Sequence, residues 1–426
     1  MARTRTTFVY MHLDEGPVPA GRLEMTEAGR NSYATFQYGA RYLQRPNRVP
    51  VDPAALALPD PNVPTQTFRT AAGFNLFNGI RDAAPDGWGR YLMHKAAGIQ
   101  NLEEFDYLVA SSDYRVGALA FGPNPTDGPK PSVPWGGEET SIGEHFDLAE
   151  LAKEAERVQS VDRLEPNLRR ILEAGSSLGG ARPKAATTRN NIPWIAKFSA
   201  KEDNYPVCRT ELAVMRLAQK CKLNVPEIDF ATFFGRDIYL IQRFDRQVEG
   251  NQFRRIPYAS SLTMLEAQEL AAHHYSYRDL ADVLRRFGSK PRQDLRELFR
   301  RMAFNILVGN DDDHLRNHAF LFDGHGWRLS PLYDVVPKPR AGLTGSLILA
   351  PGQRGHEATL ANALTGAASF GLKNDEATNL LEELRLLVNA GWQLALSEAG
   401  ISAVEIEKLT NCFVEAGRAE WQTQGN

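Results

Sequence analysis

The chain has 426 residues, of which 42% are hydrophobic and 24% charged, and its formal net charge is −3. This length exceeds one typical domain, so two or three compact units are expected. The near-neutral charge excludes general electrostatic binding of nucleic acid by the whole chain. Cys208, Cys221 and Cys412 have no CxxC spacing and are typical of reduced thiols in a cytoplasmic protein. No apolar run is long enough to span a bilayer and no signal-type apolar core follows the first residues, so no membrane attachment is expected.

The first part of the chain is expected to be a small β-rich unit. Short strands separated by turns are predicted over residues 7–13, 21–25 and 32–38. Two helices, 74–78 and 88–96, are predicted around the turn Pro85-Asp86-Gly87. The proline-rich stretch from Gly122 to Pro131 is typical of a loop or linker. A helix over 148–157 then begins the next unit.

A strand with a lysine at its end is the first candidate for ligand chemistry. The strand 193–198 carries Lys197, which is placed like the phosphate-binding lysine of protein kinases, although a strand-end lysine alone is ordinary. A periodic helix is predicted to begin at Thr210. Its Glu211 is either a partner that holds Lys197 or a first-turn residue that compensates the helix dipole.

The segments on either side of this strand suggest a nucleotide site. The stretch from Ala174 to Lys184 is rich in glycine, which lets backbone N–H groups approach phosphates closely. After the predicted strand 237–242, the backbone from Gln242 to Phe244 is a candidate for hydrogen bonds to adenine. Asp245 is a candidate ribose ligand, or else the partner of Arg243 or Arg246.

The most informative stretch is the acidic run after the helix predicted over 294–308. Asp312 lies five residues before Asn317, and Asp334 follows two short strands, 319–322 and 327–329. Protein kinases use this order for a base, a magnesium-binding asparagine and a magnesium-binding aspartate.

The same stretch has two plainer interpretations. Three adjacent aspartates can be a solvated turn, and Asp311 and Asp313 can be no more than that. His314 and His318 have the spacing of a zinc site, but Leu315 stands where a zinc protease has glutamate. The remaining helices are predicted over 277–287, 376–399 and 403–416, and the stripe Leu380, Leu381, Leu384, Leu387 and Val388 is expected to be core.

Taken together, these motifs resemble the HipA family of kinases, the toxin half of bacterial HipA–HipB toxin–antitoxin modules. The matching pieces occur in the family's order and are Ser177-Leu-Gly-Gly-Ala-Arg-Pro-Lys184, Ile195-Ala-Lys-Phe198, Leu223-Asn-Val-Pro226, Gln242-Arg-Phe-Asp-Arg246, Gly309-Asn-Asp-Asp-Asp-His-Leu-Arg-Asn317 and Leu332-Tyr-Asp334. The chain departs from some members at Arg182, where they carry Gln, and at Gln242, where they carry Glu; both changes affect nucleotide affinity rather than catalytic groups.

The resemblance implies a role for each candidate residue. Asp312 would be the catalytic base and Lys197 would hold the phosphates of ATP. Asn317 and Asp334 would bind Mg²⁺, and His314 would line the nucleotide site. Ser177 matches the family's autophosphorylated serine. The cofactor-binding set is completed by the loop residues Gly179, Gly180 and Ala181 and by the hinge residues Gln242, Phe244 and Asp245.

The resemblance also implies the fold and the partners. The fold is α+β, a bilobal protein-kinase-like fold with a β-rich N-terminal subdomain (1–121), a linker (122–147), a kinase N-lobe (148–246) and a mainly helical C-lobe (247–426). The implied function is phosphorylation of a protein serine, in characterised members that of an aminoacyl-tRNA synthetase. A HipB-like helix-turn-helix antitoxin is the implied partner, through which operator DNA would be bound. Two other functions stay open, namely a small-molecule phosphotransferase and a kinase-shaped corepressor without catalysis.

Overall fold

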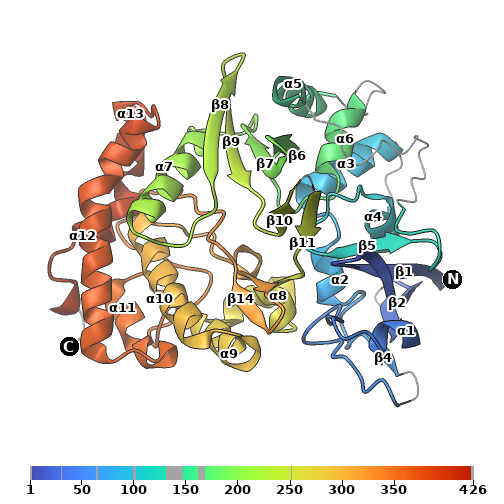
Figure 1. Ribbon diagram of the computed structural model, residues 1–426. Helices are drawn as coiled ribbons and strands as arrows, with labels where there is room; N and C mark the ends of the chain where they lie inside the picture. Colours follow the sequence, from blue (N-terminus) through green and yellow to red (C-terminus); the bar gives the residue numbers. More distant parts are fainter. Residues whose placement is uncertain are drawn as a thin grey trace. The chain divides into compact units, whose positions relative to one another are not determined.

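The computed structural model forms two compact units (Figure 1). The residues that it describes are 2–29, 31–63, 66–98, 102–130, 147–161, 168–250 and 252–423. Unit 1 comprises Met1–Lys201 and Thr232–Ala259, and unit 2 comprises Glu202–Ala231 and Ser260–Asn426. Most of the predicted linker, residues 131–146, lies outside the described residues. The domain boundaries at 121, 147 and 246 stay a prediction.

An antiparallel sheet dominates the first half of unit 1. Its strand order is β4-β3-β2-β1-β5. The strands are β1 (Arg3–Leu13), β2 (Gly16–Glu27), β3 (Tyr33–Tyr38), β4 (Thr67–Arg69) and β5 (Leu119–Gly122). β1 pairs with β2 on one side and with β5 on the other, and its middle residues, Val9, Tyr10 and Met11, are buried. The long hairpin β1–β2 therefore supplies the centre of this core.

Short helices accompany this sheet. They are α1 (Ala40–Leu43), α2 (Asn78–Asp82), α3 (Gly87–Ala97) and α4 (Glu104–Ala110). The helix predicted over 74–78 is wrong in position, because Phe77 is still extended and α2 begins at Asn78. Leu76 and Phe77 are buried, so the apolar spacing that indicated a helix comes from an irregular segment packed into the core.

The second sheet of unit 1 carries the predicted lysine strand. Its order is β6-β7-β9-β8. The strands are β6 (Lys184–Arg189), β7 (Ile192–Phe198), β9 (Arg236–Gln242) and β8 (Ile228–Phe233), of which the last crosses the division between the units. The helices α5 (Leu148–Val158) and α6 (Arg169–Gly175) precede it, and the hairpin β10 (Arg246–Glu249) and β11 (Gln252–Arg255) follows it. Residues 176–183, called the phosphate loop below, connect α6 to β6.

Unit 2 is mainly helical. Its helices are α7 (Val207–Lys220), α8 (Ser261–Met264), α9 (Tyr277–Phe287), α10 (Pro291–Val308), α11 (Leu360–Thr365), α12 (Asn374–Glu398), α13 (Ala403–Leu409) and α14 (Val414–Gly417). Single 3₁₀ turns are η2 (Glu269–His274), η3 (Leu315–Asn317), η4 (Ala367–Phe370), η5 (Thr410–Phe413) and η6 (Trp421–Thr423). A small sheet has the order β12-β13-β14, formed by β12 (Tyr258–Ser260), which crosses the division between the units, β13 (Ala319–Phe322) and β14 (Trp327–Leu329).

Helix α10 is the buried platform of unit 2. It begins with Pro291, whose fixed φ suits the first helical position. It ends at Gly309 in the left-handed conformation, with φ 63°, where a Cβ would lie 2.6 Å from the carbonyl oxygen of Cys412. Only glycine avoids both the backbone strain and this clash. The chain therefore leaves the helix sharply and enters the acidic loop, residues 310–317.

Most elements predicted from the sequence are present. The helix predicted over 277–287 coincides with α9, and the strands predicted over 193–198 and 237–242 lie within β7 and β9. The helix predicted over 403–416 is broken into α13, η5 and α14. Within the predicted core stripe of α12, Leu387 is 39% exposed whereas the other four residues are buried. The α+β class with an N-terminal strand-rich part and a helical later part is confirmed. No helix in the described ranges combines the length and apolar character needed to cross a membrane.

Candidate functional site

The three aspartates of the acidic loop have different environments. The side chains of Asp311 and Asp312 are 44% and 50% exposed and lie 3.4 and 3.6 Å from the ammonium of Lys338. Asp313 is fully buried, and its Oδ1 accepts a hydrogen bond from the backbone N–H of Ile348 at 2.8 Å. The plain interpretation of a solvated turn therefore fits Asp311 and is wrong for Asp313.

The start of the acidic loop is fastened to α10 by a buried amide. The backbone N–H of Asn310 donates to the carbonyl oxygen of Asn305 at 3.0 Å, and its side-chain Nδ2 donates to Oδ1 of Asn305 at 3.2 Å. Oδ1 of Asn310 accepts from the backbone N–H of Val336 at 3.4 Å. One side chain thus fixes the acidic loop against both α10 and the segment that follows Asp334.

Asn317 and Asp334 offer an oxygen donor set. Nδ2 of Asn317 donates to the backbone carbonyl oxygen of Asp312 at 2.6 Å, so its Oδ1 is the atom left to act as a ligand. Asp334 is half-buried and has a φ of 58°, a strained conformation for a residue with a side chain. The hydroxyl of the preceding Tyr333 donates to the carbonyl oxygen of Arg316 at 2.6 Å, which ties this segment to the turn that carries Asn317. One amide oxygen and one carboxylate fit Mg²⁺, which prefers oxygen ligands and completes its shell with water and phosphate.

The two histidines of the loop have different roles. Nδ1 of His314 accepts a hydrogen bond from the backbone N–H of Arg316 at 3.2 Å and so caps the turn η3. The ring of His318 is buried edge-on against Tyr277, with 5.3 Å between the ring centroids, and burial lowers the pKa of His318 to about 3. Among the described residues, no three His, Cys, Asp or Glu side chains are grouped so that they could hold a metal ion.

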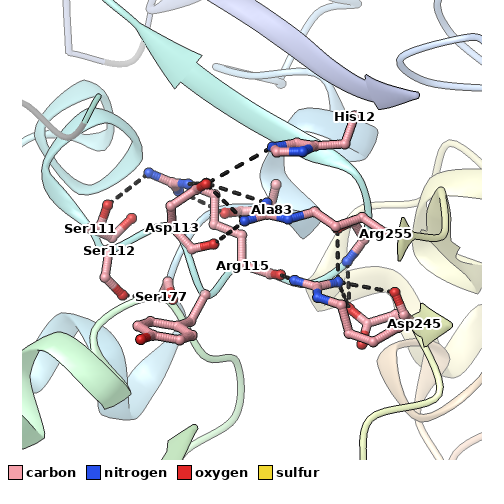
Figure 2. Close-up of polar contacts among 12 residues, drawn as sticks. His12, Ala83, Ser111, Ser112, Asp113, Arg115, Ser177, Asp245 and Arg255 are labelled. Atoms are coloured by element: carbon pink, nitrogen blue, oxygen red, sulfur yellow. Dashed lines mark hydrogen bonds and ion pairs between the residues drawn. The ribbon is translucent and has the colours of Figure 1, made fainter. Parts of the chain in front are cut away.

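In unit 1 the phosphate loop has a buried beginning and an exposed tip. Ser176 and Ser177 are 2% and 3% exposed, whereas Gly179 and Ala181 are exposed and Gly180 is half-buried. The hydroxyl of Ser177 lies 3.0 Å from the hydroxyl of Ser112 (Figure 2). The tip is therefore the accessible part of this loop, and the serine expected to be modified is held inside.

Two lysines face each other beside this loop. Lys197 on β7 lies directly opposite Lys184 on β6, and the two residues are only 9% and 8% exposed. The ammonium of Lys184 also lies against Gly180 of the phosphate loop. Phosphate binding by Lys197 stays a prediction.

The hinge segment after β9 uses its main chain and its side chains differently. The backbone N–H of Arg243 donates to the carbonyl oxygen of Pro193 at 2.9 Å and is thus occupied within the sheet. Gln242 ends β9, and it and Phe244 are half-buried. Adenine binding by the backbones of Gln242 and Phe244 stays a prediction.

Asp245 is the centre of a buried charge cluster (Figure 2). It is 3% exposed, and its two carboxylate oxygens accept hydrogen bonds from Arg243 at 3.0 and 2.8 Å, from Arg246 at 2.9 Å and from the backbone N–H of Gly117 at 2.7 Å. Burial raises the pKa of Asp245, but the two guanidinium charges outweigh this and hold it well below the usual range. Of the two roles that the sequence left open, the structure contains the pairing with arginine, while the ribose contact stays a prediction.

The loop 111–117 completes this cluster. Arg255 donates to the carboxylate of Asp113 at 2.7 Å, and Nε2 of His12 lies 3.9 Å from the same carboxylate. Arg243 and Arg246 each donate to the backbone carbonyl oxygen of Arg115 at 2.7 Å. The side chains of the predicted hinge motif therefore hold a loop of the N-terminal subdomain.

The environments of some of these residues differ from what the sequence predicts. Glu211 is 2% exposed on α7, which begins at Val207, so Glu211 lies in the second turn and the dipole interpretation is wrong. Lys197, Ser177 and Asp245 belong to unit 1, whereas Asp312, His314, Asn317 and Asp334 belong to unit 2. The residues that were missed are Ser112, Asp313 and Lys338. None of them has a sequence signal of its own, because each matters through a partner distant in the chain.

Comparisons with known proteins identify the family. Residues 10–122 match the HipA N-terminal domain and residues 176–392 match the HipA-like C-terminal domain. The structure is similar to HipA of Shewanella oneidensis, solved with HipB and operator DNA, with a TM-score of 0.68, 17% identity and coverage of 96% of this chain and 95% of that chain. The chain therefore belongs to the HipA family and has its α+β, protein-kinase-like fold, as its motifs indicated.

Curated relatives are similar over shorter stretches. The putative kinase Y4mE of Sinorhizobium fredii is 29% identical over 156 residues, which cover 35% of this chain and 36% of that protein. The serine/threonine-protein kinase toxin HipA of Shewanella oneidensis is 27% identical over 158 residues, which cover 33% of this chain and 36% of that protein. The chain thus spans only about a third of the length of these two relatives in the matching regions.

The buried carboxyl of Asp313 predicts a pH dependence of stability. Burial raises the pKa of Asp313 to about 8, whereas the pKa of an aspartate in the unfolded chain is about 3.9. Between these values the folded state binds one proton more, so the free energy of unfolding falls as pH rises, by up to about 1.4 kcal/mol per pH unit. Asp313→Asn, which keeps an oxygen for Ile348, should lack this contribution between pH 4 and 8.

Melting temperatures measured at several pH values test this. The difference between Asp313→Asn and wild type should grow in favour of the variant as pH rises toward 8. Asp311→Asn retains the buried carboxyl and should keep the wild-type slope. Equal slopes for wild type and Asp313→Asn would show that the carboxyl of Asp313 is ionised in the folded protein.

Proposed function

We propose that the protein is an ATP- and Mg²⁺-dependent serine/threonine protein kinase of the HipA toxin type. The observation that carries this proposal is the hydrogen bond from the side-chain amide of Asn317 to the backbone carbonyl oxygen of Asp312 in the acidic loop. The residue before Asp334, Tyr333, is hydrogen-bonded to the same turn. A base and a metal ligand held by the same short turn are what phosphoryl transfer needs, because catalysis there consists mainly of positioning and charge stabilisation. The names of the curated relatives agree with a kinase.

In this proposal each group of the acidic loop has one task. The exposed carboxylate of Asp312 orients the acceptor hydroxyl and takes its proton. Asn317 and Asp334 hold Mg²⁺, which neutralises charge on the phosphates when bound. Lys338, near Asp312, adds a positive charge where the transferred group would pass. His314 lines the nucleotide site.

The nucleotide side of the proposal lies in unit 1. Lys197 and Lys184 attract the phosphates, and the exposed tip Gly179-Gly180-Ala181 approaches them with its backbone. Gln242 and Phe244 contact adenine through main-chain atoms. The proposed domains are an N-terminal subdomain (1–121), a linker (122–147), an N-lobe (148–246) and a C-lobe (247–426).

The substrate and the regulation are proposed from the family. The acceptor is a serine of a protein, such as an aminoacyl-tRNA synthetase, and autophosphorylation of Ser177 is an inactivating switch. Phosphorylation adds about −1.5 to −2 charges at pH 7. That charge is incompatible with the buried position of Ser177, so the phosphate loop would leave it and ATP binding would weaken.

Removal of the proposed base tests catalysis. Asp312→Asn should lower phosphoryl transfer by roughly 10²–10⁴-fold, the typical contribution of a general base. The measurement is phosphate incorporation with magnesium-ATP, followed by mass spectrometry at Ser177. Because Asp312 is half-exposed, the melting temperature should stay close to wild type.

Asp311→Asn is the matched control, since Asp311 is similarly exposed and shares Lys338. It should keep nearly full activity. An inactive Asp311→Asn with an active Asp312→Asn would place the base one residue earlier. A wild-type protein that binds ATP but never transfers phosphate would favour the corepressor, and one that modifies only small molecules would favour the phosphotransferase.

The metal ligands can be tested by binding rather than by turnover. Asp334→Asn keeps a side chain that tolerates a positive φ but removes the charged ligand, so half-maximal ATP binding should need at least about tenfold more Mg²⁺. A fluorescent ATP analogue titrated with Mg²⁺ measures this. Asp323→Asn removes the same charge from the β13–β14 turn of the same unit and should change nothing. Identical titrations for both variants would exclude Asp334 as a ligand.

We further propose a helix-turn-helix antitoxin of the HipB type as partner. The similar Shewanella structure contains HipB and operator DNA, and a net charge of −3 gives this chain no general affinity for DNA. A helix-turn-helix protein encoded beside this chain should co-purify with it, and mobility-shift assays should show tighter operator binding by the pair than by this chain alone. Tight, salt-sensitive DNA binding by this chain without the partner would contradict the proposal.

A further inference from the structure

The phosphate loop is bracketed by elements of the N-terminal subdomain. The backbone N–H of Trp88, in the first turn of α3, donates to the carbonyl oxygen of Gly180 at 2.9 Å, and its indole Nε1 donates to that of Lys184 at 2.9 Å. A Cβ at Gly89 would lie 2.5 Å from the carbonyl oxygen of Ser176, so the helix touches the loop where only glycine fits. Helix α3 therefore holds the exposed side and the end of the loop.

The buried beginning of the phosphate loop is held by Ser112. Its backbone N–H donates to Oγ of Ser176 at 3.1 Å, and its hydroxyl shares a hydrogen bond of 3.0 Å with the hydroxyl of Ser177 (Figure 2). The position of Ser112 is fixed because the loop 111–117 is hydrogen-bonded to the buried arginines of the Asp245 cluster. These arginines donate to the carbonyl oxygens of Asp113, Tyr114, Arg115 and Gly117.

We propose that Ser112 is a positioning residue whose hydroxyl keeps Ser177 buried and thereby sets how often Ser177 becomes available for phosphorylation. The consequence for modification rests on the proposed kinase function. With Ser177 only 3% exposed, the phosphate loop must open before this hydroxyl can act as acceptor.

In the phosphorylation step, a bond forms between Oγ of Ser177 and the γ-phosphorus of ATP, and the bond from that phosphorus to the bridging oxygen breaks. ADP leaves, and the hydroxyl proton passes to Asp312 of the same or another molecule.

The hydroxyl of Ser112 stabilises the closed phosphate loop because it is hydrogen-bonded to the hydroxyl of Ser177 inside the protein. In the open state both serine hydroxyls bond to water instead. Loss of one such buried hydrogen bond shifts an equilibrium by about fivefold. Ser112→Ala should therefore raise the open fraction of the phosphate loop by about fivefold. Ser112→Thr restores a hydroxyl at a half-buried position and should behave like wild type.

The neighbouring residue offers a matched control. Ser111 is fully buried, and its hydroxyl has no hydrogen-bond partner among the described residues. Ser111→Ala removes the same atom from the same loop without touching the phosphate loop. A general loosening of the loop 111–117 would affect both alanine variants, whereas the proposed contact affects only Ser112→Ala.

Two measurements on the full chain test whether Ser112 controls the opening of the phosphate loop. The first is hydrogen exchange of the amides of residues 174–179 without nucleotide, which does not depend on catalysis. Exchange should be about fivefold faster in Ser112→Ala and unchanged in Ser112→Thr and Ser111→Ala. The second is the time course of Ser177 phosphorylation with magnesium-ATP, which should be accelerated by up to about fivefold in Ser112→Ala only.

The outcomes separate this inference from the proposed function. Equal exchange in Ser112→Ala and Ser111→Ala overturns the inference, whatever the phosphorylation shows. Faster exchange in Ser112→Ala with faster modification supports both. Faster exchange without phosphate on Ser177 in any variant supports the positioning role of Ser112 and overturns the proposed autophosphorylation.

Discussion

The buried ion cluster around Asp245 is the constraint on which the arrangement of unit 1 depends. The guanidinium groups of Arg115, Arg243, Arg246 and Arg255 are nearly inaccessible, and the two carboxylates among them belong to Asp113 and Asp245. Burial lowers the pKa of Arg115 to about 10. A buried charge without partners costs several kcal/mol, so the remaining donors need acceptors. Most of these acceptors are carbonyl oxygens of the loop 111–117, and Arg115 also donates to the carbonyl oxygens of Ala83 and Leu108. The loop, the hinge strand and the phosphate loop are consequently held as one piece.

Unit 2 reaches a comparable rigidity by a different route. Its acidic loop follows the buried C-terminal half of α10, which ends at Gly309. The loop is held by the side chain of Asn310 and by the buried carboxyl of Asp313. The contacts that hold the loop are made by amides and by a carboxyl whose pKa is raised by burial. The carboxylate proposed for chemistry, Asp312, is therefore exposed on a loop whose ends and one neighbour are fixed.

Much of the fold could be predicted from the sequence, because helices such as α9 and strands such as β7 and β9 have strong periodicity and clear ends. The order of motifs was enough to indicate the family. The exposure of the side chains of Asp311, Asp312 and Asp313 could not be predicted, because three identical residues differ only in what the rest of unit 2 packs against them. The same holds for Ser112, whose importance comes from a serine 65 positions later. The helix predicted over 74–78 was misplaced because buried apolar side chains in an irregular segment imitate helical spacing.

The close fit between α3 and the phosphate loop has a consequence for how such proteins diverge. With Gly89 packed against the backbone of Ser176, and Trp88 bonded to the carbonyl oxygens of Gly180 and Lys184, neither surface can change alone. Chimaeras that join the N-terminal subdomain of one family member to the remainder of another would mismatch two backbones that meet without side chains between them. The two parts are therefore expected to be inherited together, and a workable exchange would have to carry the first turn of α3, the loop 111–117 and the phosphate loop as one block.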